Sequence, residues 1–299
     1  MKPLFDNTVT ADDDIYKFIR DDLGQAAKDA KMFTESLWQK YCPYADNHFR
    51  VEIQKVFHAR FWEMYLACTL MDKGHKIASD NIGPDIKVEH KGNIIWIEAI
   101  APTSGSQSSN DKVPERVITN PPTAQEVPDK QIILRYRSAI HDKYDNKYFD
   151  YLSSGIITEK DYYVIAINGC RIPSSEIDRY PPRIARSVLP VGWPQVTIDT
   201  ASMQKISDGY QYRPRINKAS GSPVRTDIFL DSYYQHINAV LFSNVDVFKT
   251  TKPMGDDFKI VHNPLSKPLP SDFLNFCQQW QAKLRGDELM VSWKDSSIL

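Results

Sequence analysis

Residues 83–102, GPDIKVEHKGNIIWIEAIAP, decide the fold and carry the clearest chemical signal in the chain. The pair Lys91-Gly92 separates two apolar-rich segments, as is typical of a two-residue hairpin turn. We therefore predict two antiparallel strands whose pairing runs outward, residue by residue, from this turn. Because side chains alternate between the faces of a strand, this register places Asp85 opposite Glu98 on one face of the hairpin.

Two opposed carboxylates need an explanation, because like charges directly across a strand pair are destabilising. Glu98 also lies within the apolar segment IIWIEAIA, where an unpaired carboxylate is costly. A hard divalent cation such as Mg²⁺ would compensate both charges, since it binds carboxylate oxygens together with water and substrate phosphate. The alternative is a surface hairpin with ordinary charged positions.

A third carboxylate, Glu63, lies in the helical-looking segment FWEMYLACTLM. Leu66, Ala67 and Leu70 follow it at helical spacing, so this stripe is expected to face the core and to carry Glu63 inward. We take Glu63 as a further candidate metal ligand. The alternative is a helical ion pair with Arg60, three residues earlier.

The order of predicted elements indicates an α/β fold with helices packed on a mixed sheet. The predicted elements, in chain order, are helices within 11–76, ended by Gly74, strands within 77–101, a long polar loop at 103–129, a helix at 131–155 and a buried strand at 161–170. Loops of this length inside a compact domain are usually functional or disordered.

The pattern is looser beyond residue 172, with short strands predicted in QVTID, TDIFL and INAVLFSNVDV. A final helix is predicted in SDFLNFCQQWQAKL, with Ser271 as its N-cap and Gly286 at its end. We divide the chain into a helical N-terminal extension (1–54), a core (55–172) and a basic, irregular α+β C-terminal region packed on that core (173–299).

A helix with an inward glutamate, a Pro-Asp, a strand glutamate, a helix and a strand together resemble the PD-(D/E)xK nuclease superfamily. The resemblance covers roughly residues 55–170 and implies a restriction-endonuclease-like αβββαβ core with Mg²⁺-dependent (or Mn²⁺-dependent) phosphodiesterase activity. It implies Asp85 and Glu98 as metal-binding catalytic residues and Glu63 as the extra helix glutamate. RFWEMYLACTLMDKGHKI and IWIEAIAP also resemble a set of uncharacterised bacterial proteins of this superfamily.

One position departs from the superfamily pattern, because Ile100 stands where the family lysine is expected. In the family that ammonium positions the attacking water and stabilises negative charge near the scissile phosphate. Because the lysine migrates to other elements in some members, Lys87 and Lys143 are the candidate catalytic substitutes. The alternative for each is an exposed lysine.

A basic segment follows the predicted core. Residues 171–225 contain nine Lys or Arg and four Asp or Glu, a balance of +5 with interleaved aromatic residues, which suits phosphate contact and base stacking. The candidate nucleic-acid contacts are Gln131, Arg135, Arg183, Arg213, Arg215 and Lys218. The alternative is a solvated region whose arginines pair with nearby acids.

Composition narrows the classes of function. The 299 residues carry a net charge of −1, so no global basic field attracts nucleic acid. The four cysteines are far apart and include no CxxC, which argues against a zinc knuckle and a disulfide framework. Reduced thiols in a cytoplasm are therefore expected. The N-terminus lacks an apolar h-region, and no run of 18 apolar residues exists, so we expect no signal peptide and no membrane span.

Three functions are therefore compared. The first is a metal-dependent nuclease acting on nucleic acid, with DNA favoured over RNA and a homodimer left open. The second is a catalytically inactive module of the same fold that binds nucleic acid or a protein. The third is an α/β protein whose carboxylates are structural.

Overall fold

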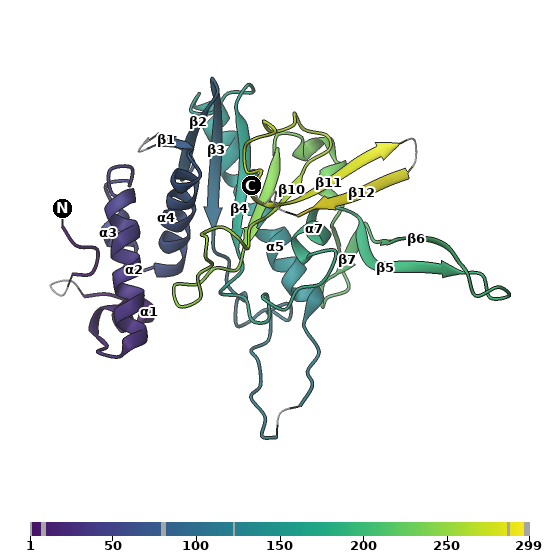
Figure 1. Cartoon of the computed structure of the whole chain (residues 1–299), viewed down its shortest axis with the longest axis horizontal. Helices are drawn as coiled ribbons and strands as arrows, with labels where there is room; N and C mark the ends of the chain where they lie inside the picture. The colour runs from purple at the N-terminus through teal and green to yellow at the C-terminus, as the bar shows by residue number, and fades with distance from the viewer. Residues whose placement is uncertain (1, 7–9, 79–81, 122, 286–287, 296–299) are drawn as a thin grey trace.

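The computed structural model describes residues 2–6, 10–78, 82–121, 123–285 and 288–295. Its helices pack on both faces of one large mixed sheet (Figure 1). The α-helices are α1 (Asp14–Asp21), α2 (Gln25–Tyr41), α3 (Phe49–Glu52), α4 (Phe57–Asp72), α5 (Asp129–Lys143), α6 (Phe149–Ser153) and α7 (Arg183–Val188). A π-helical turn, Tyr144–Tyr148, joins α5 to α6, and two 3₁₀ turns span Ile228–Leu230 and Ser232–Tyr234.

Eight strands form the main sheet in the order β1-β2-β3-β4-β9-β10-β11-β12. These strands are β1 (Lys76–Ala78), β2 (Ile86–His90), β3 (Asn93–Ile100), β4 (Tyr162–Asn168), β9 (Ala239–Ser243), β10 (Lys259–His262), β11 (Gln278–Arg285) and β12 (Glu288–Lys294). β3, β4 and β9 are mutually parallel, as are β10 and β11, and the remaining neighbours are antiparallel. The predicted α/β class is therefore confirmed, and strands from the last third of the chain extend the same sheet.

The β2–β3 hairpin has the predicted register. Lys87 pairs with Trp96, and pairing reaches His90 and Asn93 at the turn. The two turn residues Lys91 and Gly92 have φ values of 49° and 79°, the left-handed conformation that a two-residue hairpin turn requires. The turn thus sets which residues of β3 face each side of the sheet.

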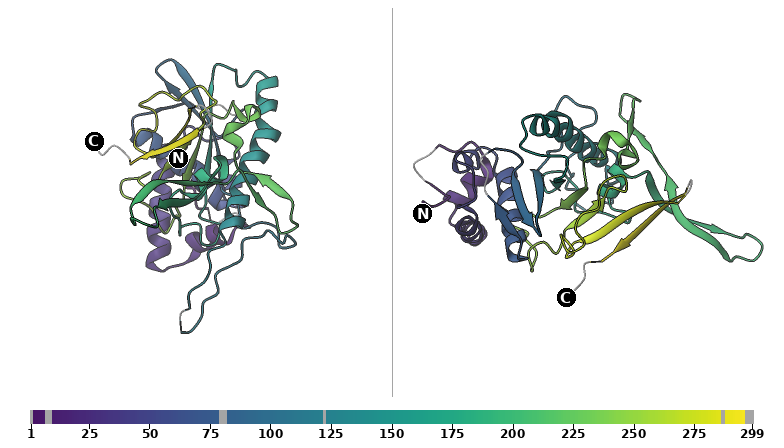
Figure 2. Two further views of the ribbon diagram at one scale, coloured as in Figure 1. Left: turned by 90° about the vertical axis from the view of Figure 1, so that its right-hand side faces the viewer. Right: turned by 90° about the horizontal axis from the view of Figure 1, so that it is seen from above.

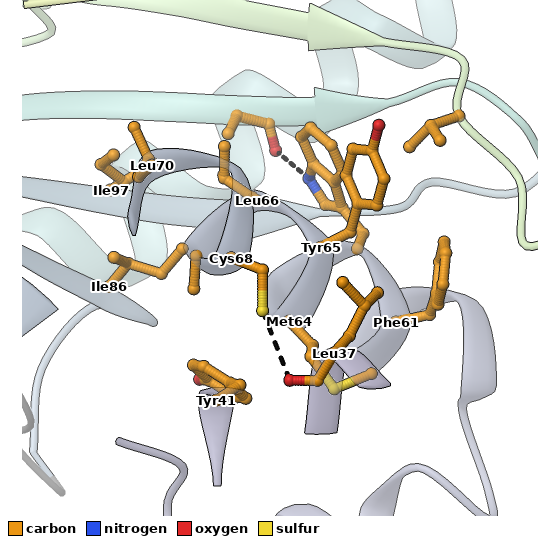
Figure 3. Packing of buried hydrophobic residues seen from close by; sticks show 14 of the residues in the cluster. Leu37, Tyr41, Phe61, Met64, Tyr65, Leu66, Cys68, Leu70, Ile86 and Ile97 are labelled. Atoms are coloured by element: carbon orange, nitrogen blue, oxygen red, sulfur yellow. Dashed lines mark hydrogen bonds between the residues drawn. The ribbon is translucent and has the colours of Figure 1, made fainter. Parts of the chain in front are cut away.

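Helix α4 lies between the N-terminal helices and the sheet. Every residue from Phe61 to Leu70 is buried, as expected for a helix covered on all sides. The Trp62 indole donates to the Ala166 carbonyl of β4 at 3.1 Å, and the Cys68 thiol donates to the Leu37 carbonyl of α2 at 3.4 Å (Figure 3). The helix is thereby held against both neighbouring layers.

The opposite face of the sheet packs against α5 and α7. Its core contains Trp96 of β3, Ile165 of β4 and Val240 of β9, together with Ile132 and Ile140 of α5. Because side chains alternate along β3, Ile95 and Ile97 face α4, whereas Trp96 and Glu98 face α5. This alternation determines which helix can supply a partner for Glu98.

Two segments project from the body of the molecule (Figures 1 and 2). One is the predicted long loop, whose described residues between β3 and α5 contain no helix or strand. The other is a separate antiparallel pair, β5 (Val191–Ile198) and β6 (Lys205–Tyr212). A further short pair consists of β7 (Arg215–Asn217) and β8 (Pro223–Arg225).

Two predictions of local structure are wrong. The expected C-terminal helix is replaced by turns and then β11, in which Trp280 and Ala282 are buried and Gln281 is exposed. Pairing with β10 and β12 overrides the helical spacing there, and Gly286 lies outside the described residues. The expected strand TDIFL contains the 3₁₀ turn Ile228–Leu230 instead.

No helix in the described ranges combines the length and apolarity needed to cross a bilayer.

Candidate active site

Glu98 is the most buried member of the candidate site. Only 2 % of it is exposed, near the carboxyl end of β3. Its Oε1 forms an ion pair with the Lys143 ammonium from the last turn of α5. Its Oε2 is buried and has no hydrogen-bond partner among the described residues. Burial and the neighbouring Asp85 charge raise the pKa of Glu98 to about 7, although Lys143 acts to lower it.

Lys143 is part-buried and carries the positive charge of this group. Burial alone would lower its pKa, but the charges of Glu98 and Asp85 outweigh burial and raise the pKa above its ordinary value. The ammonium therefore stays protonated at neutral pH. Lys143 reaches the face of β3 that also carries Ile100, which packs against the α5-side core.

Asp85 lies immediately before β2, beside the end of β3. Its Oδ2 accepts a hydrogen bond from the Ala99 amide at 2.7 Å, which fixes the carboxylate against the strand that carries Glu98. Burial raises the pKa of Asp85, while Lys143, the Ala99 hydrogen bond and Arg60 act to lower it. The charge of Asp85 is thus close enough to interact with helices on both faces of the sheet.

Glu63 points inward from α4 as predicted, and only 4 % of it is exposed. Its Oε1 accepts from the Tyr41 hydroxyl at 2.6 Å, and its Oε2 accepts from Arg60 Nη1 at 2.8 Å. Burial and the Asp85 charge raise its pKa to about 8. The ion pair with Arg60, the alternative considered from the sequence, is therefore present. Arg60 also bonds Asp46 at 3.1 Å.

Whether these carboxylates can hold a divalent cation depends on how close their oxygens lie and on which oxygens lack a partner. Glu63, Asp85 and Glu98, all within the described ranges, do not form a group whose ligand oxygens lie within 4.8 Å of one another. Glu63 already has two partners, so its role as a metal ligand stays a prediction. Asp85 and Glu98 supply hard oxygen donors, and the buried Oε2 of Glu98 lacks a partner. This pair fits Mg²⁺ chemistry, because Mg²⁺ is commonly held by one or two carboxylates.

The second candidate lysine, Lys87, has a different environment. Its ammonium lies 4.9 Å from the centre of the Trp96 ring. The ion pair with Glu98 belongs to Lys143. Of the two lysines named from the sequence, Lys143 is therefore the one that directly contacts a candidate metal ligand.

The predicted nucleic-acid contacts differ in their environments and in their exposure. Arg135 and Lys218 line a pocket of about 470 Å³ beside the long loop, where Arg135 also donates to the Thr103 carbonyl at 2.9 Å. Arg215 lies on β7 and is exposed, and Gln131 is half-buried on α5. Arg213 is half-buried and donates to the Arg186 carbonyl at 3.2 Å.

Burial removes Arg183 from the predicted nucleic-acid surface. Arg183 is 2 % exposed and Arg186 is fully buried, and both pair with Asp129 at the start of α5, each through a 2.8 Å contact. These hydrogen bonds and charges lower the pKa of Asp129 despite its burial. Pairing with acids, the alternative considered for this basic segment, therefore accounts for Arg183.

Two buried polar arrangements of the core were not predicted from the sequence. Arg137 is buried and donates to the Arg225 carbonyl at 3.1 Å and to the Tyr234 hydroxyl at 2.6 Å. The partnership of Asp129 with Arg186 joins residues 57 positions apart. Local spacing carries no signal for either arrangement.

Comparison with known proteins does not assign the chain to a family. No protein-family model, no curated protein and no solved structure matches it.

Proposed function

We propose that the protein is a divalent-metal-dependent nuclease that hydrolyses phosphodiester bonds of nucleic acid, with DNA as the favoured substrate. The observation that carries the proposal is the meeting of Glu98, Lys143 and Asp85 at the carboxyl end of β3. Glu98 lies on β3, Lys143 lies on α5, and Asp85 immediately precedes β2. Buried carboxylates with raised pKa values beside a cation are typical of functional sites rather than of ordinary surfaces.

The order of elements supports a restriction-endonuclease-like core. The chain passes through α4, then β1, β2 and β3, then α5, which the π-helical turn and α6 continue, and then β4. The β2–β3 hairpin is antiparallel, and β3 is parallel to β4. This order is the αβββαβ pattern implied by the resemblance of residues 55–170 to the PD-(D/E)xK superfamily.

Asp85 and Glu98 would hold Mg²⁺ or Mn²⁺ in this site. A bound divalent cation polarises the phosphodiester and lowers the pKa of water at the site. The protein contributes by fixing the carboxylates: the Ala99 amide orients Asp85, and burial in β3 orients Glu98. Binding requires ionised carboxylates, so the raised pKa of Glu98 makes metal affinity increase as the pH rises through about 7.

Lys143 would take the role of the absent family lysine. Ile100 carries no charge, whereas the Lys143 ammonium reaches the same face of β3 from α5. A protonated ammonium beside Glu98 can orient an attacking water and stabilise the negative charge that develops on the phosphate. Lys143 is therefore the catalytic residue of this proposal, and Glu63, which also bonds Arg60, stays a candidate metal ligand.

A second candidate function is an inactive module of the same fold that binds nucleic acid or protein. Two observations favour it. Lys143 occupies one oxygen of Glu98, and Glu63, Asp85 and Glu98, all described, do not gather their oxygens within 4.8 Å. In this state Lys143 would neutralise Glu98 in place of a metal.

A cleavage assay separates the two functions. The purified protein is incubated with single- and double-stranded DNA and RNA in Mg²⁺ or Mn²⁺, beside Asp85→Ala and Glu98→Ala. Exposed Glu89 on the neighbouring strand supplies the control, Glu89→Ala. The nuclease proposal expects cleavage by the wild type and the control only. Absence of cleavage with every substrate, or cleavage that both site variants retain, would contradict it.

A further inference from the structure

A second cluster of chemically active side chains lies where two parallel strands end. Cys170 follows β4 by two residues, and Asp246 follows β9 by three. Because β4 and β9 are parallel neighbours, both residues lie at one edge of the sheet. His58, near the start of α4, completes the cluster. Its ligand atom, the Cys170 sulfur and an Asp246 oxygen all lie within 4.8 Å of one another.

We propose that His58, Cys170 and Asp246 form a binding site for a transition-metal ion of the Zn²⁺ class. One nitrogen, one sulfur and one oxygen donor suit Zn²⁺, which binds all three ligand types, whereas Mg²⁺ prefers oxygen alone. Tetrahedral Zn²⁺, with Zn–N and Zn–S bonds of about 2.0–2.1 Å and 2.3 Å, would separate these two atoms by about 3.6 Å. The distance from His58 Nδ1 to Cys170 Sγ is 3.6 Å.

Hydrogen bonds of the Asn168 side chain connect the segments that carry Cys170 and Asp246. The side chain of Asn168, which is 1 % exposed, accepts from the Cys170 amide at 2.8 Å and donates to the Val245 carbonyl at 2.9 Å. Asp246 Oδ1 accepts from the Phe248 amide at 2.8 Å. Such supporting bonds orient metal ligands before the ion binds. The cluster is therefore held in place by the fold.

The proposed site keeps access to solvent. Cys170 and Asp246 line a pocket of about 710 Å³, and all three ligands are partly exposed. Three protein ligands with a fourth position open to water or substrate are typical of catalytic rather than purely structural zinc sites. On coordination, the Cys170 thiol proton goes to solvent and the thiolate binds the ion.

This site is separate from the Asp85–Glu98 site. The charged groups that act on His58 are Asp246, Arg171 and Asp13, whereas those acting on Glu98 are Asp85, Lys143 and Lys147. The two sets share no member. The inference therefore does not depend on the proposed nuclease activity.

Cobalt binding tests the site on the full chain, with any affinity tag removed and bound metal extracted by a chelator. Co²⁺ serves as the spectroscopic probe and Zn²⁺ as the competitor. In the wild type, one equivalent of bound Co²⁺ should give a thiolate-to-cobalt charge-transfer absorption that Zn²⁺ abolishes. Cys170→Ser should remove this absorption, and His58→Ala and Asp246→Asn should each raise the Kd at least about tenfold.

Cys42→Ser is the matched control, because Cys42 is also partly exposed but lies outside the cluster. It should retain the absorption, as should Asp85→Ala and Glu98→Ala. Absence of the absorption in the wild type, or its persistence in Cys170→Ser, would overturn the proposal. If Cys170→Ser fails to fold, the wild type decides: Zn²⁺ should raise its Tm, and an unchanged Tm would count against the site.

Discussion

The substitution Glu98→Gln tests whether the buried negative charge of Glu98 destabilises the folded protein. Glutamine has nearly the same shape as glutamate, and its amide oxygen can still accept from Lys143, but it carries no charge to bury. It therefore mimics protonated Glu98 at every pH. Because the pKa of Glu98 is raised in the folded state, the wild type should approach the stability of the variant only at low pH.

The expected magnitude follows from the pKa of about 7 against the ordinary value of 4.5. The folded state binds the Glu98 proton more tightly than the unfolded state does. Protonation of Glu98 therefore stabilises the folded state fully below pH 4.5, and this stabilisation is lost as the pH rises through about 7. The difference between these two pKa values corresponds to about 3 kcal/mol of unfolding free energy once Glu98 is fully ionised. Glu98→Gln should therefore be more stable than the wild type by about 3 kcal/mol at pH 8, and nearly equal to it at pH 4.5.

Urea unfolding, monitored by tryptophan fluorescence with a chelator present, measures this difference at several pH values between 4.5 and 8. Glu89→Gln is the control, since Glu89 is exposed and its ion pair with Lys76 lies on the surface; its effect should stay below about 1 kcal/mol at each pH. A Glu98→Gln effect that does not change with pH, or a variant less stable than the wild type at pH 8, would contradict this prediction.

Three further predictions concern catalysis and stability. Lys143→Met should lower the cleavage rate by about 10²–10³-fold, whereas Lys87→Met should leave it within a few-fold; the reverse order in a single-turnover assay would assign the role to Lys87. Asp129→Ala leaves Arg183 and Arg186 buried without their shared carboxylate and should lower the unfolding free energy by about 3–5 kcal/mol. Asp72→Ala, at an exposed ion pair with Lys40, should cost less than about 1 kcal/mol in the same urea experiment, and equal losses would contradict the burial argument. Gly255→Ala places a Cβ 2.7 Å from Thr69 Cγ2 at a φ of +81°. It should lower stability by about 2–5 kcal/mol, because overpacking of about 1–3 kcal/mol adds to left-handed backbone strain of about 1–2 kcal/mol. Gly221→Ala, with a similar φ and open space, should cost only the conformational strain of about 1–2 kcal/mol, so a larger thermal shift at Gly221 would oppose this prediction.

The elements that could be predicted from the sequence are those specified by local signals. Lys91-Gly92 determined the hairpin register, and hence the face shared by Glu98 and Trp96. Helical spacing correctly placed α4 and the inward side chain of Glu63. The position of Lys143 on the helix after β3 was sufficient to name it as a candidate, because a helix covering that face can reach the end of the strand.

The elements that could not be predicted depend on contacts between distant segments. Segment 278–285 has helical spacing, but its pairing with β10 and β12 makes it a strand. Arg183 reads as part of a basic surface because its partner Asp129 lies 54 residues earlier. The cluster of His58, Cys170 and Asp246 likewise comes from three distant segments. The parallel pairing of β4 and β9 brings Cys170 and Asp246 together, and the packing of α4 adds His58.

Anomalous X-ray diffraction from crystals soaked in Mn²⁺ shows directly whether Asp85 and Glu98 together hold a divalent cation. We predict an anomalous peak within about 2.0–2.6 Å of one oxygen from each carboxylate, with Lys143 still beside Glu98, and no such peak in crystals of Glu98→Gln. Full Mn²⁺ loading elsewhere with no peak between Asp85 and Glu98, or the same peak in the Glu98→Gln crystals, would contradict it.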